Sequence, residues 1–96
     1  PGAMLVVSPR DGSLSGIFTD GDLRRLVLRD AKELDRPVAE VMTRMPRTLS
    51  SSALVRDAVL MVREHRQDEI PVVDEAGRPV GILDVQDLIA LRLVQD

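Results

Sequence analysis

The sequence predicts a mixed α/β (α+β) protein with two short β-sheets flanked by helices. A strand, a glycine-containing turn, a second strand and a helix follow one another in "LVVSPRDGSLSGIFTDGDLRRL" (5–26) and again in "PVVDEAGRPVGILDVQDLIAL" (71–91). The two stretches align with one gap, and their Gly-Ile pairs lie 65 positions apart. This internal repeat indicates two copies of one structural unit.

The first half of the chain predicts a hairpin followed directly by a helix. Residues 4–9 and 14–19 are short runs rich in apolar residues, and "RDGS" between them has Asp-Gly turn chemistry. Helical spacing of apolar residues predicts a helix over 20–30, with the set Leu23, Leu26, Val27 and Leu28. Residues 31–40 are mostly polar and predict a linker that leads into a short helical turn at 38–42.

The second half predicts a helix, another hairpin and a final helix. A short strand is expected at 47–49, and the serines at 50–52 offer N-cap hydroxyls to a helix over 53–66. Residues 69–85 repeat the strand, turn and strand, and the last helix is expected over 85–94. The helix over 53–66 has a broad apolar face, formed by Leu54, Val55, Ala58, Val59, Met61 and Val62.

The two copies are unequal in length. About thirty residues, from roughly Val41, precede the second strand pair, whereas only four precede the first. The first copy is therefore expected to lack a leading strand and helix, so that other chain, another subunit or nothing covers part of its apolar surface. The predicted organisation is a partial first repeat at 1–30, a linker at 31–40 and a second repeat at 41–96.

Composition excludes several classes of function. The 96 residues, 44% of them hydrophobic, suit one small domain or a pair of small repeats. A formal charge of −3 and a single aromatic residue, Phe18, argue against nucleic-acid binding. The absence of cysteine excludes disulfides and thiolate metal sites and suits a reducing cytoplasm. Short apolar runs interrupted by charge predict neither a membrane span nor a signal peptide.

The sequence predicts no catalytic or metal-binding residues. His65 is the only histidine and is expected at a surface or a helix end, so no nucleophile relay can be assembled. The stretch Asp20-Gly21-Asp22 resembles the start of a calcium loop, but the further oxygen ligands do not follow. Arg24 and Arg25 could reach a phosphate, but solvated residues on the exposed face of a helix are the favoured interpretation. Met42, Met45 and Met61 are expected to fill the core.

Polar residues three positions apart mark both junctions between a predicted strand and helix: Thr19 with Asp22, and Asp84 with Asp87. Both pairs fit a capping box, in which the first side chain accepts a hydrogen bond from the first helical turn and the later acid favours the helix dipole. The same helix end also suits a ligand, with amides and a hydroxyl for phosphate and an acid for a ribose diol. Caps and sites can coincide, so both interpretations stay open.

A family resemblance rests on longer stretches. The segment "IPVVDEAGRPVGILDVQD" (70–87), preceded by "VMTRMPRTLSSSALVRDAVLMVREHR" (41–66), resembles a cystathionine-β-synthase (CBS) repeat, and two such repeats resemble a CBS pair, or Bateman module. The segment "GIFTDGDLRR" (16–25), followed by "VAEVMTRMPRTL" (38–49), is similar to the C-terminal CBS pair of bacterial arabinose 5-phosphate isomerases. Those isomerases supply a precursor for Kdo and lipopolysaccharide synthesis. The resemblance covers nearly the whole chain.

The resemblance implies tandem β-α-β-β-α repeats, the first truncated at its N-terminus, with two nucleotide clefts. Transferred by position, Gly16, Thr19 and Asp22 form the first site, with Thr19 toward phosphate and Asp22 toward ribose. The implied second site comprises Thr48, Ile70 and Pro71 along the base, together with Gly81, Asp84 and Asp87.

Asp84 departs from the family pattern, because it stands where the pattern has serine or threonine. A carboxylate at this position repels a phosphate unless a base such as Arg44, Arg47 or Arg66 offsets it. This departure favours the first site over the second.

The function implied is that of a non-catalytic regulatory module that requires no cofactor. AMP, ATP or CMP-Kdo would settle between the repeats and bias an isomerase domain N-terminal to this segment. A homodimer through the repeats is expected, without nucleic-acid or membrane partners. In the alternative, the clefts are vestigial and the module serves mainly to assemble subunits. The set Gly16, Thr19 and Asp22 favours the regulatory function, whereas Asp84 and the truncated first repeat favour assembly.

Overall fold

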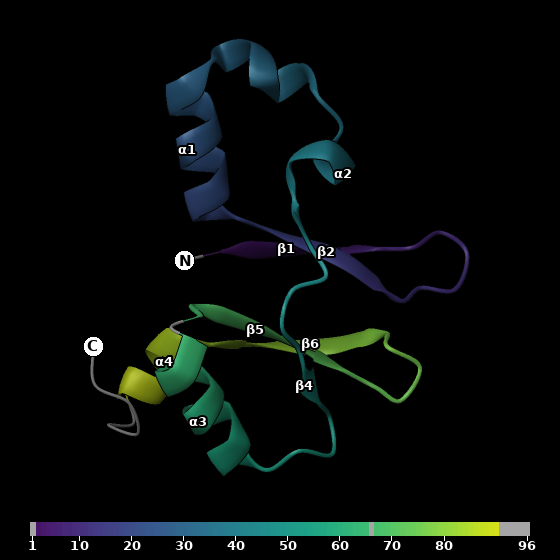
Figure 1. Cartoon of the computed structure of the whole chain (residues 1–96), viewed down its shortest axis with the longest axis vertical. Helices are drawn as coiled ribbons and strands as arrows, with labels where there is room; N and C mark the ends of the chain where they lie inside the picture. The colour runs from purple at the N-terminus through teal and green to yellow at the C-terminus, as the bar shows by residue number, and fades with distance from the viewer. Residues whose placement is uncertain (1, 66, 91–96) are drawn as a thin grey trace. The chain divides into compact units, whose positions relative to one another are not determined.

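The computed structural model describes residues 2–65 and 67–90, without the side chains of Asp87, Leu88 and Ala90. The chain divides into two compact units, residues 1–46 and 47–96. Each unit contains a three-stranded sheet together with helices (Figure 1), so the predicted mixed α/β class with two small sheets is confirmed. Within the described residues, no helix has the length and apolar character needed to cross a membrane.

The first unit is a hairpin with a third strand added on one edge. Its sheet has the order β1-β2-β3, and both neighbouring pairs are antiparallel. Gly12 closes the hairpin turn with a φ of 77°, a conformation that favours glycine. The elements in chain order are β1 (Ala3–Val7), β2 (Leu14–Thr19), α1 (Asp20–Arg29), the 3-10 helix η1 (Ala31–Asp35), α2 (Val38–Val41) and β3 (Thr43–Arg44).

The second unit repeats the hairpin but adds its third strand on the opposite edge. The sheet order is β4-β5-β6, in which β4 runs parallel to β5 and β5 antiparallel to β6. Its core contains Val62, Ile70 and Val85, with Leu49, Val59 and Met61 among the side chains packed against them. The elements are β4 (Leu49–Ser50), α3 (Val55–His65), β5 (Glu69–Val73), β6 (Pro79–Asp84) and α4 (Val85–Ala90).

The two hairpins are structural copies of each other. Val6 pairs with Gly16 in one, Val72 pairs with Gly81 in the other, and a register irregularity follows at the next residue of β1 and of β5. Gly77 takes the place of Gly12 in the turn, with a φ of 79°. The sequence repeat is therefore a repeat in strand register and turn geometry as well.

The segment that leads into the second repeat is shared between the two units. Its first part, α2 and β3, belongs to the first unit, where β3 pairs with β2 and α2 also packs on β2. Its second part, β4 and α3, belongs to the second unit. Strand β3 was not expected from the sequence, because two residues are too few to show a period.

Two local features were not expected from the sequence. The predicted linker at 31–40 contains η1, which begins after Asp30, whose carboxylate accepts a hydrogen bond from the Lys32 amide at 2.9 Å. The serines at 50–52 form a turn, in which the Ser50 hydroxyl accepts from the Ser52 amide. The capping carboxylate of α3 is instead Asp57, which accepts from the Leu54 amide at 2.8 Å.

Burial also departs from the expected apolar sets. Leu26 is the residue of α1 that is buried, whereas Leu23, Val27 and Leu28 are exposed. In α3, Ala58 and Val62 are buried but Leu54 and Val55 are exposed at its start. Met45 is exposed in a left-handed conformation, so the core-filling role expected for it is wrong, whereas Met61 does pack against the core. The final helix is described as far as Ala90, and residues 91–94 lie outside the described part.

Candidate ligand-binding site

The N-terminus of α1 is a complete capping box. Thr19 Oγ1 accepts a hydrogen bond from the Asp22 amide at 3.0 Å, and Asp22 Oδ2 accepts one from the Thr19 amide at 2.9 Å. The capping prediction for this pair is confirmed. The box fixes the Asp22 carboxylate at the start of the helix, with one oxygen bound to the backbone and the other directed elsewhere.

The second oxygen of Asp22 binds an arginine from the next turn of α1. Arg25 Nη2 donates to Asp22 Oδ1 at 2.8 Å, so Arg25 is more than a solvated residue of the helix surface. The Arg25 side chain is 71% exposed and that of Asp22 22%. Burial raises the pKa of Asp22, but hydrogen bonds from the Thr19 amide and from Arg25 outweigh it and hold the pKa below its ordinary value of 3.8.

Acid should therefore remove part of the stability of the first unit. Because the folded pKa of Asp22 lies below the unfolded value, its contribution is present above pH 3.8 and is lost as the pH falls through the folded pKa. Asp22→Asn retains an acceptor oxygen but no charge, so it should be less stable than the parent at pH 6 and closer to the parent at pH 3. Urea unfolding at both pH values measures this difference. An equal difference at both values would show that the Asp22 charge is not its source.

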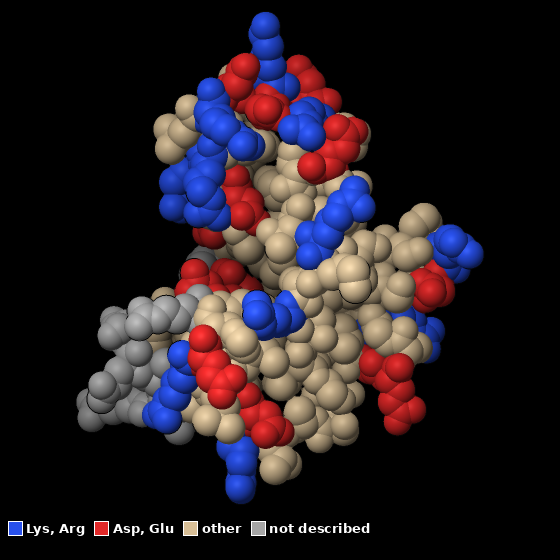
Figure 2. Space-filling model, viewed as in Figure 1, with Lys and Arg blue, Asp and Glu red and all other residues tan. Residues whose placement is uncertain are grey.

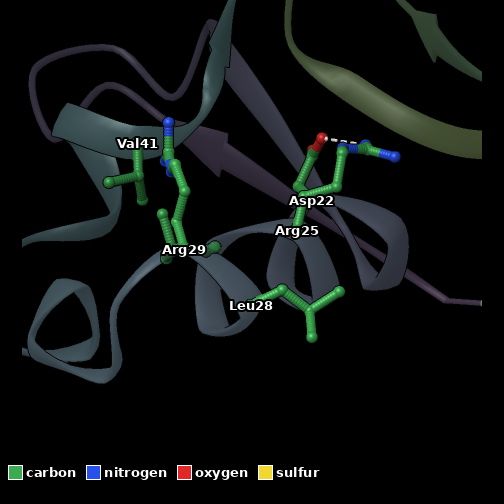
Figure 3. A pocket seen from close by; sticks show the side chains of 6 residues that line it. Asp22, Arg25, Leu28, Arg29 and Val41 are labelled. Atoms are coloured by element: carbon green, nitrogen blue, oxygen red, sulfur yellow. Dashed lines mark hydrogen bonds and ion pairs between the residues drawn. The ribbon is translucent and has the colours of Figure 1, made fainter.

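A hollow of about 490 Å³ lies beside this box. Figure 3 shows Asp22 and Arg25 on one side of it and Arg29 with Val41 on the other. The hollow therefore joins an acid, two guanidinium groups and apolar side chains within the first unit. Its lining consists of Asp22, Arg25, Leu26, Leu28, Arg29 and Val41.

Sequence reasoning identified Asp22 in this lining and missed Arg29 and Val41. Arg29 lies one helical turn after Arg25 in α1, a spacing that places both on one side of the helix, and this signal was readable in "LRRLVLR". Val41 ends α2 and comes close to α1 through the tertiary fold, which no local pattern of the sequence indicates.

Gly16 lies on β2 between two strands. It pairs with Val6 of β1 and Arg44 of β3. A Cβ atom at this position would lie 2.5 Å from Met42 Sδ and 2.7 Å from the Thr43 carbonyl oxygen, so the close approach of β3 requires glycine here. The packing of β3 thus accounts for this glycine without a ligand.

Three residues of the implied second site lie at or near the core of the second unit. Ile70 and Pro71 on β5 are fully buried, and Ile70 packs with Val62 and Val85. Thr48 is half-buried and directly precedes β4. The side chains of Ile70 and Pro71 are already used in packing, so a contact between them and a nucleotide base stays a prediction that the described packing does not favour.

The remaining second-site residues lie on β6 and α4. Gly81 is exposed, and a Cβ built there meets no atom within 4 Å. Asp84 Oδ1 accepts a hydrogen bond from the Gln86 amide at 2.8 Å and so caps α4. Asp87 lies in α4, but its side chain lies outside the described part.

The bases expected to offset Asp84 have different positions. Arg44 lies in the first unit, where its Nη2 donates to the Ala39 carbonyl oxygen at 3.2 Å. Arg47 is exposed at the start of the second unit, and Arg66 lies outside the described residues. Offset of the Asp84 charge by one of them stays a prediction.

Charge is mixed around the first site. On the face shown in Figure 2, basic side chains gather along α1 with acidic ones beside the start of that helix, whereas both signs are mixed over η1. In the part of the chain that the structure describes, no three acidic or histidine side chains are grouped so as to hold a metal ion. The acid and the two guanidinium groups that line the hollow suit a ligand with both hydroxyl and anionic groups.

Comparison with protein families identifies the fold. The CBS domain model matches residues 38–93, which is more than half of the chain. The chain belongs to the CBS domain family. The likeness extends to solved structures: a CBS domain protein from Pyrobaculum aerophilum complexed with AMP superposes with a TM-score of 0.82 at 24% identity, over 96% of this chain and 73% of that one. At that identity the likeness shows the fold.

Two further relatives are informative. The CBS protein CBSX2, solved in complex with AMP, has a TM-score of 0.75 at 26% identity, and the match covers 95% of this CBS chain and 70% of that one. Arabinose 5-phosphate isomerase KdsD of Pseudomonas aeruginosa is 37% identical over 86 residues, which is 90% of this chain and 26% of that enzyme. The CBS chain thus spans about a quarter of the length of the isomerases that it matches.

Proposed function

We propose that this CBS chain is a regulatory module that binds an adenine nucleotide or a nucleotide-sugar and modulates a sugar-phosphate isomerase domain of a longer chain. The observation that carries the proposal is the Asp22 carboxylate, which the capping box fixes beside a hollow lined by Arg25 and Arg29. The AMP complex of CBSX2 supports a nucleotide, and the likeness to KdsD supports an isomerase as the attached domain.

Ligand binding would exchange one partner of Asp22 for another. Asp22 Oδ2 stays on the Thr19 amide, while Oδ1 leaves Arg25 and accepts from a ribose hydroxyl. The released guanidinium and Arg29 are then available to a phosphate, which guanidinium groups bind well. Because the Arg25 side chain is 71% exposed, its ion pair contributes at most about 1 kcal/mol and gives way at small cost.

Modulation requires that the ligand bind two states of the module with different affinities. An isomerase domain attached to the chain would then favour one of these states, and the ligand would shift the balance between them. The module itself supplies no catalytic group in this scheme. AMP, ATP and CMP-Kdo are the ligands to test, since each carries both a ribose and a phosphate.

Calorimetric titration with AMP, ATP and CMP-Kdo tests the proposal. Asp22→Ala should weaken binding of the ligand by about 10- to 100-fold, because a hydrogen bond to a charged group contributes about 1.5–3 kcal/mol. Asp30→Ala is the matched control: it removes the aspartate cap of η1 in the same unit. Each variant should also lose about 1 kcal/mol of stability through its lost cap.

Unchanged affinity in Asp22→Ala, or an equal loss in both variants, would contradict the site. If binding persists in Asp22→Ala but is lost in Gly81→Val, the binding site would be assigned to the second repeat. Either result is separable from loss of folding, because unfolding curves of all variants are recorded on the same samples.

A second function has one observation in its favour. Leu23 and Val27 lie one turn apart on α1 and are 43% and 44% exposed, which leaves an apolar strip on that helix. In this alternative the strip packs against a second copy and the CBS module assembles subunits. Absence of saturable heat with all three ligands, together with a dimer in sedimentation, would favour assembly.

A further inference from the structure

Helix α2 forms part of the wall of the hollow, although packing alone holds it weakly. Val41, its last residue, lines the hollow on the side opposite Asp22 and Arg25 (Figure 3). Val38 and Val41 are half-buried, and the two residues between them are exposed. Pro37, which precedes α2, has no polar side-chain atom with which to cap it. Because a helix of a single turn has little stability of its own, the position of Val41 depends on the groups that hold α2 from outside.

Two arginines that flank α2 in the sequence hold it on both sides. Arg36 Nη1 donates to Glu33 Oε2 of η1 at 2.8 Å. Its Nε and Nη2 donate to the same oxygen of Glu40 in α2, Oε1, at 3.4 Å each. On the other side, Arg44 Nη2 of β3 donates to the Ala39 carbonyl oxygen at 3.2 Å. One guanidinium group therefore bridges η1 and α2, and a second joins α2 to β3.

The bridge formed by Arg36, Glu33 and Glu40 connects the two sides of the hollow. The η1 segment follows α1 directly and packs against it, and α1 carries Asp22 and Arg25. The side chains of Arg36 and Glu33 are 42% and 26% exposed, so their ion pair is partly shielded from solvent. A charged network with two carboxylates on one guanidinium has more influence on structure than an isolated surface pair. The bridge thus fixes α2 relative to the helix that carries the proposed ligand-binding groups.

We infer that Arg36 is a positioning residue that links α2 to η1 and so keeps Val41 in the wall of the hollow. Arg36 is not among the described residues that line the hollow, so it acts on a ligand through Glu40 and α2. A wall that is already ordered lowers the free-energy cost of binding, because the ligand does not have to order it. This effect on affinity rests on the proposed function, whereas the link between η1 and α2 does not.

A single thiol in the wall tests the link without any ligand. The chain contains no cysteine, so Val41→Cys supplies the only thiol, and its reaction rate with the neutral reagent N-ethylmaleimide reports movement of α2 away from the hollow. Arg36→Gln in this background should raise the rate about two- to fivefold, the range expected for partly exposed ion pairs. Glu40→Gln should have a similar effect, and the double variant should add little to either, as expected for two residues in contact.

Arg10→Gln is the matched control, since it removes the same charge from the turn between β1 and β2 and should leave the labelling rate unchanged. An unchanged rate in Arg36→Gln, or an equal rise in Arg10→Gln, would overturn the inference. Circular dichroism of every variant separates either result from loss of folding.

Calorimetry of Arg36→Gln, without the cysteine, measures the effect on the ligand. Affinity for whichever of AMP, ATP and CMP-Kdo binds the parent should fall, but by no more than the factor by which labelling rises, because opening only reduces the binding-competent fraction. A larger fall would make Arg36 a direct ligand contact, and unchanged affinity would remove its positioning role; both would overturn the inference. If the parent binds none of the three while labelling still rises, the proposed function is contradicted and the link is supported.

Discussion

Ile70→Ala is expected to lower the free energy of unfolding of the second unit by about 2–5 kcal/mol. Ile70 is 1% exposed and packs with Val62 and Val85, while β5 is held between β4 and β6. Its removal leaves a cavity that neighbouring strands cannot readily fill. Small domains have about 5–15 kcal/mol of total stability, so a large share of the unit's stability would be lost.

Ile82→Ala is the matched control for this substitution. It removes the same side chain from the neighbouring strand, but Ile82 is 44% exposed, so a loss below about 1 kcal/mol is expected. Urea unfolding followed by circular dichroism measures both variants. Equal losses would contradict the packing described for β5. A loss of nucleotide affinity in Ile70→Ala without loss of stability would support the site function that the family resemblance implies for Ile70.

Local chemistry explains what the sequence could predict. The turns of both hairpins and the Thr19–Asp22 capping box depend on residues within a few positions of one another. The spacing of apolar residues along the chain likewise indicated both hairpins and the helices that follow them. The repeat then made the two-sheet architecture predictable, because similar sequences adopt similar units.

Non-local pairing explains what the sequence could not predict. Nothing in residues 43–44 indicates that they pair with Ile17 and Gly16 of β2, 26 and 28 positions earlier, because register is set by tertiary packing. The family pattern predicts Gly16 as a site residue, and the sequence gives no sign that Met42 and β3 pack over it; its role toward a ligand stays a prediction. The same applies to Ile70 and Pro71: their family positions suggested a binding wall, and only the fold shows that they are buried.

The contrast between Gly16 and Gly81 gives a prediction of opposite sign at equivalent positions of the repeat. Gly16→Ala should lower the free energy of unfolding by about 1–3 kcal/mol, because its Cβ atom overlaps Met42 and the Thr43 carbonyl, and the overlap forces β3 away from β2. Gly81→Ala should raise it by about 0.5–1 kcal/mol, because alanine restricts the unfolded chain and meets no atom in the folded one.

Thermal and urea unfolding of the two variants, with Gly16→Ala repeated in a Met42→Ala background, measure this contrast. Removing the Met42 side chain eliminates the nearest clash, so part of the Gly16→Ala loss should be recovered, as expected for two residues in contact. The recovery should be incomplete, since the Thr43 carbonyl oxygen remains 2.7 Å from the new Cβ atom. Equal effects at Gly16 and Gly81, or no coupling to Met42, would mean that β3 does not cover β2 as described.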